Sequence, residues 1–142
     1  MPNSSSSSSS YPASIEQTIC DILAGNSAVV ALVGQRITPN DLKQGTIFPA
    51  VCFQRITKAP GSITNQGSSG VICQREQFDC YDVSYVGAQA TGDAIEKAIL
   101  FYRGGNVQGI FPIDNRDEPK LAVIQDQNVF NSQIEVYIWY NQ

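Results

Sequence analysis

The sequence contains no histidine, and this absence removes several kinds of chemistry at once. Ser–His and Cys–His nucleophile pairs are excluded, together with the commonest general base near neutral pH, so an enzyme would have to use carboxylates or lysine. The four cysteines contain no C-x-x-C pair and have no histidine to join them, which argues against a zinc site. We therefore expect neither a metal nor a cofactor.

Long apolar runs and targeting signals are also missing from the sequence. No stretch approaches the roughly 20 apolar residues of a membrane-spanning helix. Residues 1–11 carry neither a positive cluster nor an apolar run, so no secretory signal is expected. We interpret Cys20, Cys52, Cys73 and Cys80 as small buried side chains kept reduced in a cytosol, with a disulfide between neighbouring strands as the alternative.

Charged residues make up only 15% of the chain, and the formal net charge is -4. Acids and bases are scattered without a basic stripe, so tight binding along a phosphate backbone is not expected. The sequence has no phosphate loop and no G-x-G-x-x-G motif. The glycine-rich residues 61–70 lack both the lysine and the following helix that phosphate binding requires.

A length of 142 residues fits one domain that can bury a core without disulfides. The first residues form an Asn- and Ser-rich run that has almost nothing to bury. We expect a flexible Ser-rich tail over residues 1–12 and a single folded domain over residues 13–142.

Helices are predicted where apolar side chains recur at helical spacing. Residues 12–25 and 84–102 each carry such a stripe, and we expect Gly104 to follow the end of the second one. Residues 27–33 form a shorter helical piece, for which Ser27 is a candidate cap.

Strands are predicted from alternating apolar and polar residues between turn signals. The predicted strands are residues 36–38, 48–57, 71–82, 107–114, 121–124 and 129–140. Strands 48–57 and 71–82 would form a long hairpin around the loop 58–70. The fold class expected is α+β, a mainly antiparallel sheet with two helices packed on one face.

The strand over residues 71–82 places polar and charged side chains on both of its faces. This pattern indicates that one face is in water or meets a polar interface. Glu76, Asp79 and Asp82 are the carboxylates that a small enzyme would use, if a pocket shifted their pKa values. The acidic residues within 114–118 lie in a predicted charged turn, where we interpret them as solvated.

The last predicted strand has two faces, and both are candidates for burial. One carries a regular apolar series and is a normal core face. Its members are Ile134, Val136, Ile138 and Tyr140. The other face begins polar, passes Glu135 and ends in Tyr137 and Trp139. Two interpretations stay open, because either another protein docks on these aromatics or a helix or loop of the same chain covers them.

Two arginines in mid-strand and one long loop complete the candidate contact residues. Arg55 and Arg75 suit ion pairs between subunits, and an ordinary surface position explains them equally well. The loop 58–70 is long for a compact domain, so it is a candidate for reaching a neighbouring subunit or ring. The residues proposed for that contact are Ser62, Ile63, Thr64, Asn65 and Gln66.

Several segments, taken in order, resemble the tail-terminator (tail-completion) family of long-tailed bacteriophages and related gene-transfer particles. They are Ile37-Thr38-Pro39 after an apolar segment, Phe48-Pro49-Ala50-Val51-Cys52-Phe53-Gln54-Arg55-Ile56, Gln77-Phe78-Asp79-Cys80-Tyr81 before a helix, and Val136-Tyr137-Ile138-Trp139-Tyr140 at the end. The resemblance extends from about Ile15 to Tyr140. The Ser-rich start departs from it.

The resemblance implies a virion protein that assembles in the host cytoplasm as a hexameric ring. The ring would cap the tail tube, end its elongation and present the surface that joins the tail to the head. Its partners would be other copies of the chain, the tail-tube protein and a head-closure or connector protein. Genomic DNA would only pass through the lumen, no membrane would be involved, and the family implies no catalytic residues.

Other functions fit parts of the same sequence. A head-closure or adaptor protein would form a ring at the portal end, and a tail-tube subunit or sheath-type protein would polymerise into filaments. A small carboxylate enzyme would hold its acids in a deep pocket. A small-ligand binding module would have a well-formed apolar cavity.

Overall fold

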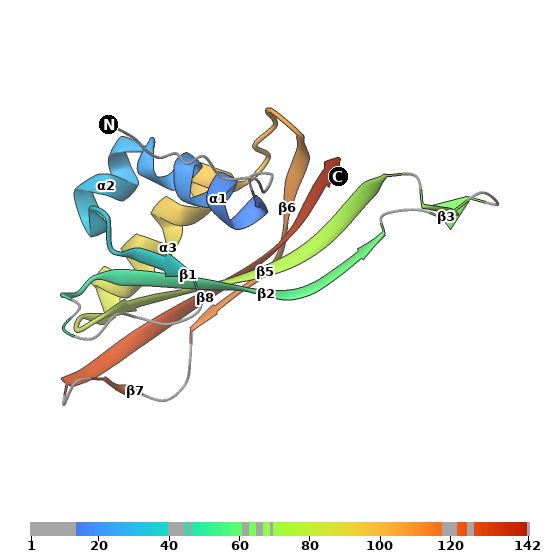
Figure 1. The fold of residues 1–142 in the computed structure, drawn as a ribbon. Helices are drawn as coiled ribbons and strands as arrows, with labels where there is room; N and C mark the ends of the chain where they lie inside the picture. The colour runs from blue at the N-terminus through green and yellow to red at the C-terminus, as the bar shows by residue number, and fades with distance from the viewer. Residues whose placement is uncertain are drawn as a thin grey trace.

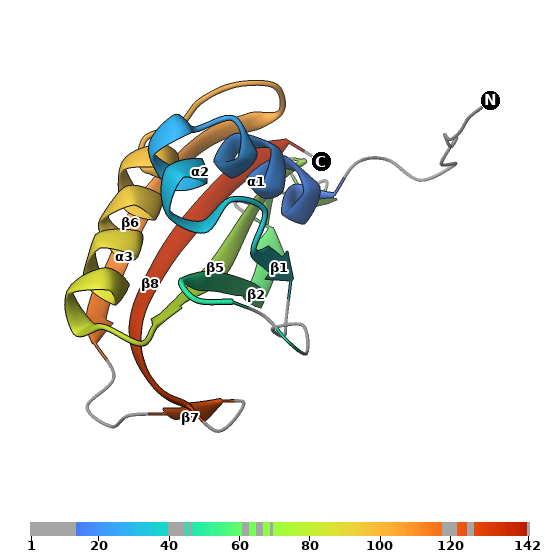
Figure 2. The ribbon, with the colours of Figure 1, turned by 90° about the vertical axis from the view of Figure 1, so that its left-hand side faces the viewer.

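A computed structural model describes residues 14–39, 45, 47–60, 63–64, 67–68, 70–117, 122–124 and 127–141. Its helices are α1 (Ile15–Ala24), α2 (Ser27–Val33) and α3 (Tyr85–Ile99). Its strands are β1 (Ile37–Pro39), β2 (Ala50–Pro60), β3 (Ile63–Thr64), β4 (Gly67–Ser68), β5 (Val71–Asp82), β6 (Val107–Asp117), β7 (Ala122–Ile124) and β8 (Gln127–Asn141). The helices lie together on one face of a twisted sheet (Figures 1 and 2). The expected tail over residues 1–12 lies outside the described residues.

Side-chain caps set the start of each helix. Ser14 Oγ accepts a hydrogen bond from the Gln17 N–H, and Ser84 caps α3 in the same way. The second helix is capped by Asn26, whose Oδ1 accepts from two backbone N–H groups at 3.1 Å each. Ser27, the expected cap, is instead the first helical residue, because the longer Asn26 side chain precedes it and reaches those N–H groups.

The third helix ends before its expected boundary. It stops at Ile99, because Leu100 is extended and Phe101 has a positive φ of 64°. The Phe101 N–H donates to the Ile110 carbonyl oxygen on β6 at 2.8 Å, so pairing with a strand replaces the last helical turn. The sequence pattern does not contain this long-range bond, and it placed the helix end near Gly104.

Gly92 lies on the side of α3 that packs against β8. A Cβ atom at this position would lie 3.0 Å from Ser132 Oγ and 3.4 Å from Ile134 Cδ1. The absence of a side chain at Gly92 therefore lets α3 pack close to β8, although glycine has a low helix propensity.

The main sheet has the strand order β1-β2-β5-β8-β6, and β7 adds to β8 beyond this path. All its pairings are antiparallel except that of β1 with β2, which is parallel. The α+β class and the 48–57 with 71–82 hairpin are confirmed. The expectation is corrected in two respects, because the sheet is mixed and three helices cover its face.

Two strands extend into segments that were expected to be a loop and a charged turn. β2 pairs with β5 as far as Pro60, and β3 and β4 form a small hairpin inside the segment that was expected to be a loop. β6 pairs with β8 as far as Asp117, so residues 115–117 are strand and not the expected charged turn. Backbone pairing with a long neighbouring strand outweighs local propensity at these polar residues.

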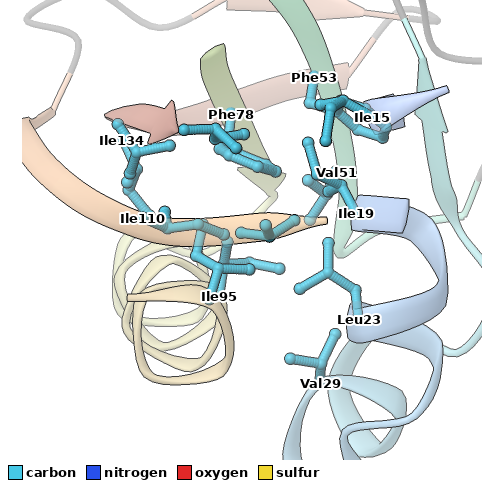
Figure 3. Close-up of a cluster of buried hydrophobic side chains, with 14 of the residues drawn as sticks. Ile15, Ile19, Leu23, Val29, Val51, Phe53, Phe78, Ile95, Ile110 and Ile134 are labelled. Atoms are coloured by element: carbon cyan, nitrogen blue, oxygen red, sulfur yellow. The ribbon is translucent and has the colours of Figure 1, made fainter. Parts of the chain in front are cut away.

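The core lies between the helices and the covered face of the sheet (Figure 3). Phe53 of β2 and Phe78 of β5 stack with ring centroids 5.5 Å apart, and both are almost completely buried. The apolar face of β8 is confirmed as a core face, since each of its four predicted members is buried. Helix side chains complete this cluster, among them Ile19, Leu23 and Ile95.

The outer half of the β2–β5 hairpin extends past the helices (Figure 1). Residues 54–60 of β2 are exposed without interruption, whereas Ala50 to Phe53 are buried. The register shifts between Arg55 and Thr57, which leaves Ile56 as an extra residue in β2. We call residues 54–60 the outer segment of β2.

Candidate assembly interface

The face of the sheet opposite the helices carries the predicted aromatic residues of β8. Tyr137 is 40% exposed, and Trp139 is partly buried. β6 supplies their neighbours, because Phe111 is in register with Tyr137 and Gly109 with Trp139. The three helices lie on the other face, so strand neighbours of the same chain give Trp139 only partial cover.

A wide hollow of about 1030 Å³ opens beside Trp139. We call it the aromatic hollow, and it is lined by Phe101, Arg103, Gly104, Val107, Gln108, Gly109, Phe111 and Trp139. The rings of Phe101 and Phe111 meet edge to face with centroids 6.2 Å apart, and these side chains are 66% and 44% exposed. Exposed aromatic rings that gather around a depression are typical of a surface that another protein covers.

Glycine at position 109 gives the hollow its shape. A Cβ atom there would lie 2.7 Å from Cζ of Phe111, inside the ring's own space. The missing side chain therefore lets the Phe111 ring lie back across β6, next to Trp139. Phe101 reaches the same place because its backbone turns away from α3 at its positive φ.

Arg75 and Glu135 form an ion pair within the chain. Arg75 Nε donates to Glu135 Oε2 at 2.7 Å, and a guanidinium Nη contacts the same oxygen. The Glu135 side chain is 5% exposed and that of Arg75 is 36% exposed, so the arginine covers the carboxylate. These two predicted contact residues are thus brought together, and each already has a partner in its own subunit.

Arg55 lies apart from the other candidate residues. It is exposed on β2 and in register with Glu76, so it belongs to the same sheet face as the helices. Arg75 and Tyr137 belong to the opposite face. Among the loop candidates, Ile63 and Thr64 form β3, while Ser62, Asn65 and Gln66 lie outside the described residues.

The helix-side polar residues of β5 are buried, whereas Arg75 and Gln77 on its opposite face are half-buried, so the partly exposed face expected for this strand is the one away from the helices. Gln74 Nε2 donates to Glu16 Oε2 of α1 at 2.7 Å and to Glu76 Oε2 at 3.0 Å. The hydroxyl of Tyr140 donates to Gln74 Oε1 at 3.1 Å. Helix α1 therefore docks on this part of the sheet through a hydrogen-bonded network as well as through apolar contacts.

Glu76 is the most unusual member of this network. It is 0% exposed, and its Oε1 has no hydrogen-bond partner among the residues that the structure describes. Burial raises the pKa of its carboxyl from 4.5 to about 7, the Gln74 hydrogen bond opposes this rise, and the Glu16 charge adds to it. Because the carboxyl has no exposed surface, it is not placed to act on a substrate.

The other two candidate acids are engaged in local contacts. Asp79 is 8% exposed, and its Oδ1 accepts hydrogen bonds from Gln77 and Asn131. Asp82 Oδ1 accepts from the Val83 N–H at 2.7 Å at the end of β5. These carboxylates thus make contacts within the fold, and Asp79 lies on the opposite face of β5 from Glu76. Among the helices described, none has the length and apolar character that crossing a membrane requires.

Sequence reasoning missed Phe101 and Phe111. Phe101 was placed within the predicted helix 84–102 and Phe111 within the predicted strand 107–114, and neither was given a contact role. The alternation Gly109-Ile110-Phe111 carried a usable signal, because Ile110 is buried and its two neighbours therefore face the opposite side.

Comparison with known proteins finds a similarity in structure. No family model matches the sequence, and no curated protein matches it. Among solved structures, the chain is similar to one in a structure described as the virion of a native gene transfer agent (GTA) particle. The TM-score is 0.64 at 10% sequence identity, over 87% of this chain and 92% of the other. At this identity the likeness establishes a shared fold.

Proposed function

We propose that the protein is a structural component of a phage-like virion, and specifically a tail terminator. The observation that carries the proposal is the fold shared with a chain of a GTA particle, which covers nearly the full length of both chains. The family resemblance of the sequence supports the same assignment. In this role six copies would form a ring that caps the tail tube and offers its outer face to a head-closure or connector protein.

Such a subunit meets the physical requirements for stopping the growth of a polymer. A protein that stops a polymer must bind the growing end without recreating it, and a closed ring with two different faces does this. The protomer is strongly two-sided, since its helices lie on one face of the sheet and exposed aromatic residues on the other. Genomic DNA would pass through the lumen, and the net charge of -4 favours a passage that does not grip it.

We assign Tyr137 and Trp139 as anchors between subunits or rings, because large aromatic side chains dominate the energetics of interfaces. The variants Tyr137→Ala and Trp139→Ala are expected to fold and to lose ring formation or tail capping. Val86→Ala, which trims a 72% exposed side chain of α3, is the control for the loss of an exposed apolar group. Normal rings and normally capped tails in the Trp139 variant would count against the anchor role.

The segment between β2 and β5 is the second proposed contact, and it would reach an adjacent ring or neighbour. Deletion of residues 62–69 would shorten the hairpin tip without touching the core. We expect rings to form and tail attachment to fail. Tails that attach normally after the deletion would remove this role.

Negative-stain imaging of the purified protein, with and without tail tubes of its own particle, tests the function itself. Rings seated at tube ends are the expected result. Long filaments of the protein alone would identify a tail-tube or sheath subunit. Rings found at the portal end would identify a head-closure or adaptor protein.

A further inference from the structure

The outer segment of β2 is exposed to an unusual degree for a strand. β1 pairs only with Val51, Cys52 and Phe53, so no described strand lies against the outer edge of residues 54–60. Ile56 is 40% exposed there, and the exposed cations Arg55 and Lys58 flank it. A two-stranded ribbon without cover is marginally stable by itself, so this segment is suited to docking on another surface.

A surface that carries two carboxylates lies at the other edge of the sheet. A second depression of about 400 Å³ adjoins the aromatic hollow and shares Phe101 with it. Asp93 and Glu96 of α3 line this depression, and Lys97 lies beside them. Glu96 is held toward β6 by a hydrogen bond from the Asn115 side chain. Exposed aromatic rings are therefore bordered by these two carboxylates and by the cations Lys97 and Arg103.

We propose that these two surfaces bind each other in neighbouring copies of the chain. Ile56 of one copy would contact Phe101 and Phe111 of the next copy. Arg55 and Lys58 would then lie beside the carboxylates of Asp93 and Glu96. The occupant of the aromatic hollow is thus a second copy of this protein, because its exposed Ile56 matches the apolar floor and its flanking cations match the carboxylates of Asp93 and Glu96.

The position of the two surfaces in the sheet fits a head-to-tail contact. The register Arg55 to Glu76, Glu76 to Val136 and Val136 to Pro112 places β2 and β6 at the same level, with two strands between them. Three strand spacings separate the two surfaces by about 14 Å, and they face away from each other within one copy. A contact between two different surfaces is a head-to-tail contact, which generates a closed ring when the rotation between copies closes.

Charge exchange tests the contact at three exposed residues, Arg55, Lys58 and Asp93, and at the half-buried Glu96. The double variants Arg55→Glu with Lys58→Glu, and Asp93→Lys with Glu96→Lys, are each expected to weaken self-association roughly tenfold to a hundredfold. The variant that carries all four changes is expected to recover association, because the reversed charges again face each other. Asp21→Lys reverses an exposed carboxylate on α1 and serves as the control.

Sedimentation velocity of the purified full chain gives the association constants, and circular dichroism checks that each variant is folded. A wild-type chain that stays monomeric up to its solubility limit would overturn the proposal. Association that is unchanged in either double variant, or that fails to recover in the fourfold variant, would overturn it as well. This inference rests on the proposed function, in which copies of the chain associate into a ring. If rings form and respond to the charge changes as expected but never sit at tube ends, this contact stands and the terminator role is refuted.

Discussion

Replacing Glu76 by glutamine should stabilise the protein at neutral and alkaline pH. The Glu76 side chain is 0% exposed, and burial raises its pKa from 4.5 to about 7 in the folded chain. Between these two values the unfolded chain releases the proton while the folded chain keeps it. The unfolded state therefore binds fewer protons, and the free energy of unfolding falls as the pH rises. Glutamine removes this penalty because it stays neutral at every pH.

The magnitude follows from the two pKa values. At pH 8 the wild-type carboxyl costs about 3 kcal/mol of stability, and at pH 5 it costs about 1 kcal/mol. The packing and hydrogen-bond cost of the amide is the same at both pH values, so it cancels when the two are compared. The gain from Glu76→Gln should accordingly be larger at pH 8 than at pH 5 by about 2 kcal/mol.

Urea unfolding followed by circular dichroism at pH 5, 6, 7 and 8 measures this difference. Asp21→Asn, which neutralises an exposed carboxylate on α1, controls for the loss of one negative charge. Glu76→Ala separates the carboxyl from its volume, because it also removes the ionisation but leaves a cavity. A gain from Glu76→Gln that is equal at pH 5 and pH 8, or larger at pH 5, would refute the reasoning about the buried carboxyl.

Three further changes test local packing, and urea unfolding measures each of them. Gly92→Ala should destabilise the protein by about 1 to 3 kcal/mol, because the new methyl group would press on Ser132 although alanine favours helices. Arg75→Ala should cost about 1 to 3 kcal/mol by leaving the buried Glu135 carboxylate without its cation, and adding Glu135→Gln should recover most of that loss. Ser84→Ala should cost about 1 kcal/mol through the lost α3 cap, and Ser84→Gly only a few tenths.

Local sequence patterns were sufficient for the elements whose side chains decide their own burial. The stripe of Ile15, Ile19 and Leu23 predicted α1, and the alternation around Val136 predicted the core face of β8. Both patterns are read within one element, because every second residue of a strand, or every third to fourth residue of a helix, turns to the same side. The hairpin of β2 and β5 was found for the same reason.

Features that depend on distant partners were missed. Residues 58–60 of β2 and 115–117 of β6 lack a strand pattern, and they are strand only because β5 and β8 are long enough to pair with them. Gln74 and Glu76 look like solvent-facing residues, but a glutamate of α1 and a tyrosine of β8 meet them in the fold. The burial of these polar groups depends on elements that lie far away in sequence, so no local sequence pattern can predict that burial.

The candidate interface illustrates why the aromatic site was only half predicted. Trp139 and Tyr137 could be predicted because they lie near the end of a strand whose other face is plainly apolar. Phe101 and Phe111 belong to different elements, and they meet only because α3 ends early and the Phe101 N–H bonds to β6. The hollow that they form is a product of chain topology, since Gly109 leaves room for it and no single segment contains its residues in order. Such a surface depends on where helices and strands end, and the periodicity of apolar residues within a helix or strand does not predict those ends.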